Sequence, residues 1–221
     1  MGKIKEAVKT ILKEIPDNVE IVAAAKSRTA EEILEAIEAG IRIIGENYIQ
    51  ESQPIIEKIG DRAIWHFIGH LQKNKVKYVV PLYHMIETVD SRPLAEQISK
   101  HALKHGKVMP VLIEINSARE PQKFGVFPEK ALDLIKDIKA LPGLKVMGLM
   151  TMGPAVEHPD HLRPFFEETK ALFDAIRNEC IDGVEMKYLS MGMSDSYRVA
   201  IEAGANVIRI GTKIFGQRPQ Q

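Results

Sequence analysis

The stretch EIVAAAK, residues 20–26, decides the fold. Its β-branched and small apolar residues are typical of a short buried strand, and a lysine follows directly. A helix is expected to begin after Thr29, which can form a capping box with Glu32. An open, doubly wound sheet of the dinucleotide-binding type would place a glycine-rich turn between this strand and this helix. Ala23-Ala24-Ala25-Lys26 stands there instead, which favours a closed barrel.

Outward from this segment, apolar runs alternate with longer segments of helical period. We expect strands at Glu20–Ala25, Ile41–Gly45, Ala63–Ile68, Met85–Val89, Val108–Ile115, Lys145–Met150, Tyr188–Met191 and Val207–Ile210. We expect helices at Ile4–Ile15, Ala30–Ala39, Tyr48–Ile59, Lys73–Val80, Pro93–His105, Pro128–Ala140, Leu162–Asn178 and Tyr197–Ala203. Eight such units predict an α/β fold, a (β/α)8 TIM barrel, for which about 200 residues is near the lower limit. Residues 1–221 are expected to form a single domain, with the doubly wound sheet as the alternative.

Composition excludes several classes of protein. The 30 basic and 30 acidic side chains cancel, which argues against a nucleic-acid or anionic-membrane binder. No apolar run approaches the roughly 20 residues of a membrane span. The one cysteine, Cys180, cannot form an internal disulfide, and the opening segment Met1–Ile15 is charged throughout. We therefore expect a cytoplasmic protein that binds neither nucleic acid nor membrane.

In a barrel, functional side chains follow the carboxyl ends of the strands. Lys26 holds that place after the first strand. A lysine that abuts a buried strand loses hydration, which favours its neutral, nucleophilic amine and suits Schiff-base chemistry with a carbonyl compound. The alternative is a lysine that simply emerges into solvent, because lysine is rarely fully buried. Three small alanines before Lys26 leave space beside the amine.

The last two strand–helix junctions form a second candidate site. Barrel enzymes often bind phosphate at the loops after their seventh and eighth strands, through backbone N–H groups. Ser194 follows the seventh expected strand as a candidate N-cap, and Gly211 and Thr212 follow the eighth. The alternative is that these glycines only make tight turns. Two anion-friendly turns at the two expected junctions favour a phosphate site.

Arg209 and Asn47 are further candidates at strand ends. Arg209 lies within an apolar strand, where an unpaired guanidinium would be costly. It should therefore face a carboxylate or a ligand at the barrel mouth. Asn47 follows the second strand, where it can supply hydrogen bonds to a ligand or cap the next helix. No P-loop, HExxH or GxSxG motif is present.

Taken together and in order, these motifs resemble one family. The chain is similar to the pyridoxal phosphate homeostasis proteins, which share the barrel of the alanine racemase N-terminal domain. The likeness is carried by Val22–Lys26, Gly45–Glu51, Trp65–Lys75, Lys123–Gly125, Gly148–Met152, Leu189–Ser194 and Arg209–Gly216. The family usually has Val-Ser before the lysine, where Ala24-Ala25 stand here, and an acid at the position of Ser196.

The resemblance implies that Lys26 forms an internal aldimine with pyridoxal 5′-phosphate (PLP). It also implies that Ser194, Gly211 and Thr212 hold the phosphate and that Arg209 faces the pyridine nitrogen. The cofactor-binding residues expected as a set are Lys26, Asn47, Ser190, Ser194, Arg209, Gly211 and Thr212. The implied activity is the intracellular buffering of PLP or its transfer to apo-PLP enzymes, by a monomeric protein that is not an enzyme.

Two other functions remain open. A PLP-dependent amino-acid racemase on the same barrel would need a second acid–base group opposite the lysine, which such racemases take from an added β domain. Only twelve residues follow Arg209, too few for that domain. A lysine aldolase acting on a sugar phosphate would need no PLP, and the purified protein would lack a yellow chromophore.

Overall fold

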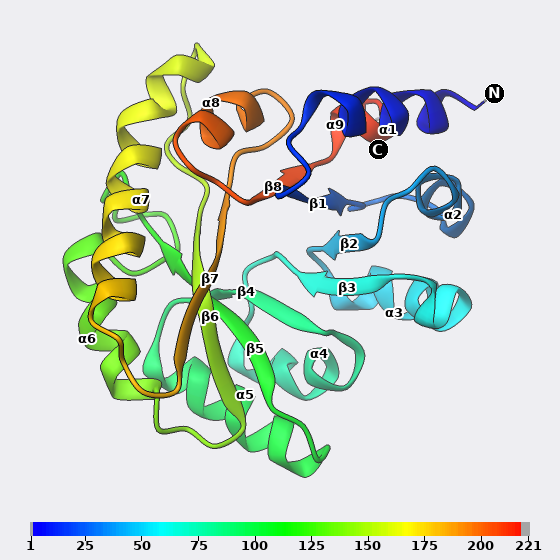
Figure 1. Ribbon diagram of the computed structural model, residues 1–221. Coiled ribbons are helices and arrows are strands. Elements are labelled where there is room, and N and C mark those ends of the chain that lie inside the picture. Colours follow the sequence, from blue (N-terminus) through cyan, green and yellow to red (C-terminus); the bar gives the residue numbers. More distant parts are fainter. Residues whose placement is uncertain (1, 218–221) are drawn as a thin grey trace.

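Eight parallel strands close into one barrel in which each strand pairs with the next and β8 pairs with β1. The computed structural model describes residues 2–217 (Figure 1). The strands are β1 (Glu20–Ala24), β2 (Ile43–Glu46), β3 (Ile64–Phe67), β4 (Met85–Val89), β5 (Met109–Ile115), β6 (Leu144–Thr151), β7 (Val184–Met191) and β8 (Val207–Ile210). The expected (β/α)8 barrel is confirmed, and the doubly wound sheet is not formed.

Helices surround the barrel (Figure 1). They are α1 (Lys3–Glu14), α2 (Ala30–Glu38), α3 (Ile49–Ile59), α4 (Val76–Leu82), α5 (Arg92–Lys104), α6 (Pro128–Ile138), α7 (Arg163–Asn178), α8 (Tyr197–Glu202) and α9 (Thr212–Phe215). Three short 3₁₀ turns lie at Gly60–Arg62, Lys73–Lys75 and Pro159–Leu162. Helices α1 and α9 pack side by side, so the two ends of the described chain meet. None of the helices within residues 2–217 is long and apolar enough to cross a membrane.

The predicted capping box starts the first helix after β1. The side chain of Thr29 accepts a hydrogen bond from the N–H of Glu32, at 3.2 Å. The carboxylate of Glu32 accepts one from the N–H of Thr29, at 2.8 Å. These two bonds satisfy backbone donors that have no partner within the helix. The turn from β1 into α2 is therefore fixed immediately after Lys26.

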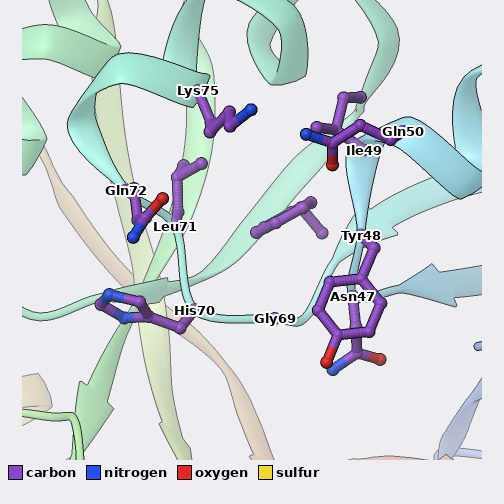
Figure 2. Close-up of a pocket in the computed structure, with 10 residues that line it drawn as sticks. Asn47, Tyr48, Ile49, Gln50, Gly69, His70, Leu71, Gln72 and Lys75 are labelled. Atoms are coloured by element: carbon purple, nitrogen blue, oxygen red, sulfur yellow. The ribbon is translucent and has the colours of Figure 1, made fainter.

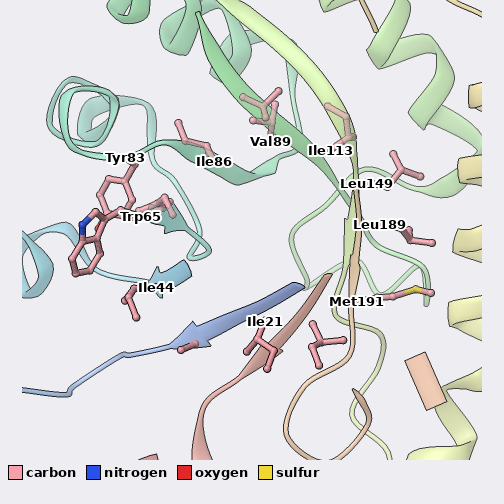
Figure 3. Close-up of a cluster of buried hydrophobic side chains, with 14 of the residues drawn as sticks. Ile21, Ile44, Trp65, Tyr83, Ile86, Val89, Ile113, Leu149, Leu189 and Met191 are labelled. Carbon is pink, nitrogen blue, oxygen red and sulfur yellow. The ribbon is translucent and has the colours of Figure 1, made fainter. Parts of the chain in front are cut away.

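The core divides at the barrel wall because side chains alternate along each strand. One face of every strand packs against the helices in a single large cluster, part of which appears in Figure 3. The other face fills the barrel interior with two smaller clusters, one of them built from Val22, Ile43 and Val207. The second contains Met85, Leu112 and Met150. The lower barrel is therefore a packed core, and the interior becomes polar only above it.

Strand β7 differs most from its predicted range. It begins at Val184 rather than at Tyr188. Its first half was not expected, because Glu185 and Lys187 alternate with Val184 and Met186 and so interrupt the apolar run. The charged residues are exposed on one side of the strand, and Glu185 pairs with Lys145 of β6 at 2.6 Å. An apolar-run criterion misses a strand whose first half is amphipathic. The four-residue helix α9 was also not expected.

Candidate functional site

A pocket of about 280 Å³ opens at the carboxyl ends of the strands. Its lining comes from the ends of β1, β2, β3, β6, β7 and β8 and consists of Ala24, Asn47, Ile68, Met152, Met193, Ser194, Asp195, Arg209, Gly211 and Thr212. The fold thus gathers five of the expected cofactor-binding residues around one space, although they come from three separate parts of the sequence. The other two, Lys26 and Ser190, lie beside and beneath it.

Lys26 lies at the mouth of the barrel, half-buried, two residues after the pocket residue Ala24. The strand ladder continues past β1 through a bond from the Ala25 N–H to the Gly45 carbonyl, at 2.9 Å. Ser27 then adopts a left-handed conformation with φ of 62°, which is uncommon for a residue with a side chain. This sharp turn directly after Lys26 is a backbone strain of the kind that clusters at functional sites.

The amine of Lys26 contacts the aromatic side chain of Tyr48. Its Nζ donates a hydrogen bond to the Tyr48 hydroxyl at 3.1 Å and lies 4.5 Å from the centre of the ring. Tyr48 was expected inside a helix that begins there, but α3 begins at Ile49 and Tyr48 remains extended. Asn47 does not cap that helix, because the N-cap residue is Tyr48. Asn47 instead lines the pocket.

Two backbone N–H groups converge on one point at the end of β8. The hydroxyl of Ser194 accepts hydrogen bonds from the N–H of Gly211 at 3.2 Å and from the N–H of Lys213 at 3.3 Å. A Cβ on Gly211 would lie 3.3 Å from the Ala24 carbonyl, so β8 passes close to β1 here. We call the groups of Ser194, Gly211, Thr212 and Lys213 the anion cradle. Its donor set matches a phosphate, which accepts several hydrogen bonds at once.

Ser194 belongs to the anion cradle, but it is not the N-cap residue that we expected. Helix α8 begins at Tyr197 with Ser196 as its N-cap residue, so Ser194 is not the cap. The hydroxyl of Ser196 accepts a hydrogen bond from the N–H of Met193 at 3.1 Å, which tightens the loop after β7. Ser194 is thereby turned toward β8.

Arg209 is buried at the base of the pocket, where it both lines the space and contacts the protein. Its Nη1 donates to the hydroxyl of Ser190 at 2.6 Å, and its Nη2 donates to the Thr151 carbonyl at 2.8 Å. Burial lowers the pKa of Arg209, and the nearby carboxylates of Glu87 and Glu114 oppose that shift. We expected Arg209 to face a carboxylate or a ligand; its hydrogen bonds go to a hydroxyl and a carbonyl, and the carboxylate of Glu87 is reached only through Ser190.

Ser190 lies beneath the pocket and does not line it. It is fully buried, and its hydroxyl donates to Glu87 at 2.6 Å while it accepts from Arg209. The second oxygen of Glu87 lies 2.7 Å from Nδ1 of His66. Burial alone would raise the pKa of Glu87, but the hydrogen bonds and charges of His66, Arg209 and Ser190 hold it below its usual range. These four side chains form one buried chain across the barrel from β3 to β8.

Two further pockets adjoin the site. One, of about 310 Å³, lies beside Met152 and is lined by Glu114, whose Oε2 is buried without a hydrogen-bond partner among the described residues. Burial and the charge of Asp90 raise the pKa of Glu114 to about 7. The other, of about 380 Å³, lies between the β2–α3 and β3–α4 connections (Figure 2). It shares Asn47 with the pocket of about 280 Å³ described above.

Sequence reasoning missed several of these groups. Glu87, Glu114 and His66 were not among the expected site residues, and Tyr48 appeared only within the stretch Gly45–Glu51 and at the start of an expected helix. Glu87 and Glu114 stand within apolar strands, as Arg209 does, and that signal could have found them. Within residues 2–217, no group of three or more His, Cys, Asp or Glu side chains is placed to hold a metal ion.

Comparison with known proteins identifies relatives along nearly the whole chain. Residues 1–219 match the family model of the alanine racemase N-terminal domain. The pyridoxal phosphate homeostasis protein of Aquifex aeolicus is 42% identical over 199 residues, which cover 90% of this chain and 86% of that protein. The protein of the same name from Mus musculus is 38% identical over 209 residues, covering 90% of this chain and 76% of that protein.

Solved structures agree with this result. PipY of Synechococcus elongatus, solved with PLP bound, superposes with a TM-score of 0.88 at 27% identity and covers 96% of this chain and all of that one. An alanine racemase of Clostridium difficile superposes with a TM-score of 0.80 over 99% of this chain and 60% of its own, at 14% identity, which shows a shared fold alone. By sequence and by structure, the chain belongs to the pyridoxal phosphate homeostasis proteins, built on the barrel of the alanine racemase N-terminal domain.

Proposed function

We propose that this protein binds PLP and serves its intracellular homeostasis, holding the cofactor reversibly for buffering or transfer. The observation that carries the proposal is the anion cradle beside Lys26. Strands β1 and β8 are paired, with Val22 opposite Arg209, so the lysine and the cradle follow adjacent strand ends. A lysine amine and a phosphate site at one barrel mouth are the two groups that an aldehyde phosphate requires.

The cradle suits the phosphate of PLP because it offers several hydrogen-bond donors and contains no negatively charged group. The N–H groups of Gly211 and Lys213 already point at one oxygen, that of Ser194. In this proposal a phosphate oxygen takes that place, and the Ser194 and Thr212 hydroxyls turn to donate to it. Asp195 also lines the pocket. Because it is exposed, solvent screens the repulsion between its carboxylate and the phosphate.

Arg209 supports a binding role over a catalytic one. When bound, PLP supplies an aldehyde for linkage to an amine and a ring that withdraws electrons most strongly when its nitrogen is protonated. We propose that the Arg209 guanidinium faces that nitrogen and disfavours a second positive charge there. Because the Ser190 hydroxyl and the Thr151 carbonyl both accept hydrogen bonds from Arg209, the guanidinium is fixed in this orientation. In this proposal the protein therefore holds PLP without using it for amino-acid chemistry.

We infer that the protein acts in the cytoplasm as a monomer, and that apo-PLP enzymes receive the cofactor from it. The position of Lys26 supports exchange, because its amine is half-exposed at the mouth of the barrel. A link at this position is open to water and to incoming amines.

The test is a spectrum of the protein mixed with PLP, before and after borohydride reduction, followed by mapping of the modified peptide. We expect a yellow imine band and a reduced adduct on Lys26. Lys26→Ala should lose the fixed adduct, whereas Lys58→Ala, which changes an exposed lysine on α3, should keep it. An adduct on another lysine, or a colourless protein with PLP in excess, would contradict the proposal.

A further inference from the structure

Tyr48 contacts the amine of Lys26 in two ways. Its hydroxyl accepts a hydrogen bond from Nζ at 3.1 Å, and its ring face lies 4.5 Å from the same atom. The residue follows Asn47 at the end of β2, and Figure 2 shows both at the edge of the neighbouring pocket. Within residues 2–217, this is the only hydrogen bond that the Tyr48 hydroxyl makes.

The fold itself makes little use of the Tyr48 side chain. It is 46% exposed, although a large aromatic residue usually buries most of its surface. As the N-cap residue of α3 it makes no side-chain capping bond. A hydroxyl that is aimed at the one amine expected to react, on a side chain that the core does not need, indicates a chemical role.

We propose that Tyr48 transfers protons when Lys26 attaches and releases the cofactor aldehyde, so that it is a catalytic residue for loading and unloading. This inference rests on the function proposed above. It requires only that Lys26 forms a Schiff base, and it does not depend on which proteins receive PLP.

The reaction balances without any further reactant. The ammonium of Lys26 loses two of its three protons, and a C=N bond forms between Nζ and the aldehyde carbon. The aldehyde oxygen takes up those two protons and leaves as water, so the product is a protonated imine. Release is the reverse, in which water adds and the C=N bond breaks. In both directions protons must pass between a nitrogen and an oxygen that are separated by one carbon.

A tyrosine hydroxyl is suited to this transfer because it donates and accepts at once. Tyr48 accepts a hydrogen bond from Nζ in the present geometry, and its own O–H is free to donate to an oxygen beside the amine. Such a relay accelerates loading and release by the same factor, because it lowers one barrier that both directions cross. It leaves the affinity for PLP unchanged.

The experiment compares wild type with Tyr48→Phe, which keeps the ring and removes the hydroxyl. Loading is followed by the growth of the imine band after mixing with PLP, and release by its decay after dilution. General acid–base groups contribute typically about 10²-fold or more, and water can partly replace an exposed hydroxyl, so we expect both rates to fall about 10- to 100-fold. The dissociation constant should stay within about twofold of the wild-type value, since a proton relay acts on the barrier alone.

The chain offers a matched control in Tyr78 on α4. It is 47% exposed and lies beneath Lys77, whose Nζ is 4.8 Å from the ring centre. Tyr78→Phe therefore removes a tyrosine hydroxyl from a second lysine–aromatic pair, one that lines neither the 280 Å³ pocket nor the two pockets beside it, and it should leave both rates unchanged. A melting curve of each variant checks that the fold is kept.

A second readout uses the protein without PLP. The rate at which dinitrofluorobenzene labels Lys26 should change in Tyr48→Phe and not in Tyr78→Phe, because only the first variant removes a hydroxyl that contacts the attacking amine. If Tyr48 only packs against the amine, Tyr48→Phe will match wild type in both assays, and the proposal is wrong. It is equally wrong if only one rate changes and the affinity changes with it.

The two proposals fail in different ways. A wild-type protein that forms no imine band with PLP contradicts the proposed function. A wild-type band with unaltered kinetics in Tyr48→Phe contradicts only the role of Tyr48.

Discussion

Arg209 donates a hydrogen bond of 2.6 Å to Ser190, and this contact joins the candidate cofactor pocket to the buried interior of the barrel. Ser190 passes the connection to Glu87, and Glu87 to His66. The buried guanidinium thus lies one hydroxyl away from a buried carboxylate. Because an isolated buried charge is very costly, we infer that Glu87 and Arg209 depend on each other for their charged states.

The first prediction concerns Glu87→Gln. Removal of one member of a buried charge pair leaves the other uncompensated, which typically costs about 3–5 kcal/mol. We expect the lower end of that range, since Ser190 lies between the two charges. Urea denaturation measures the loss in the free energy of unfolding. Glu96→Gln is the control, because Glu96 pairs with Arg92 on the surface of α5, and it should change stability by less than about 0.5 kcal/mol. Equal effects of the two variants would contradict the buried charge network.

The second prediction concerns the anion cradle. Pyridoxal without its phosphate should bind much more weakly than PLP, because several charge-assisted hydrogen bonds, each roughly 1.5–3 kcal/mol, are absent. Ser194→Ala should weaken PLP binding by about one such bond and leave pyridoxal binding nearly unchanged. Titrations followed at the imine band give both affinities. Ser91→Ala, at the start of α5, is the control. Equal affinities for pyridoxal and PLP would refute the cradle.

The sequence was sufficient to predict the barrel and most of its mouth. Lys26, Gly211 and Thr212 could be predicted because a strand end is a local feature, and barrel closure brings all strand ends to one face. Ser190 was expected to contact the cofactor because it stands near the end of β7, but its hydroxyl is used between Glu87 and Arg209. Whether a residue near a strand end points into the pocket or below it depends on the stagger between strands, which short apolar runs do not determine.

The residues that were missed depend on long-range contacts. Ser190 and Glu87 are 103 residues apart, and nothing in either local sequence pairs them. Tyr48 was missed for a different reason: the expected helix included it, and the structure begins that helix one residue later. Helix ends are uncertain by a residue or two from sequence. Here that shift turns the side chain toward Lys26.

The third prediction concerns Glu46, which is 2% exposed at the end of β2. Burial, with a contribution from the charge of Glu51, raises the pKa of Glu46 to about 8, and a hydrogen bond from the Asn47 N–H opposes the shift. The carboxyl of the unfolded chain titrates near its ordinary value of 4.5. Between these two values the folded protein keeps a proton that the unfolded chain has lost. The free energy of unfolding therefore falls as the pH rises from 4.5 to about 8, and the contribution is lost above that.

Glu46→Gln should remove that dependence, because the amide has a similar shape and never ionises. The wild type should lose up to a few kcal/mol relative to the variant between pH 5 and pH 9, at about 1.4 kcal/mol per unit of pKa difference. Urea denaturation at pH 5, 7 and 9 measures the difference. Glu57→Gln, on the exposed side of α3, should run parallel to wild type. A stability difference between Glu46→Gln and wild type that does not vary with pH would show that the carboxyl is ionised in the fold.

The fourth prediction is that the PLP-loaded protein does little or no chemistry on amino acids. Loss of a proton from the Cα of an amino acid needs a strongly electron-withdrawing ring, and a charged arginine at the ring nitrogen weakens it. In this structure the carboxylates of Glu87 and Glu114 favour the charged form of Arg209, against the effect of burial. The exposed position of Lys26 and Tyr48 also admits water, which weakens electrostatic stabilisation of developing charge.

The measurement is solvent deuterium exchange at the Cα of alanine and serine, by NMR, with free PLP and an alanine racemase as the two references. We expect exchange no faster than with free PLP. Exchange near ~10 s⁻¹, the median turnover of enzymes, would overturn the carrier function in favour of a racemase-like enzyme.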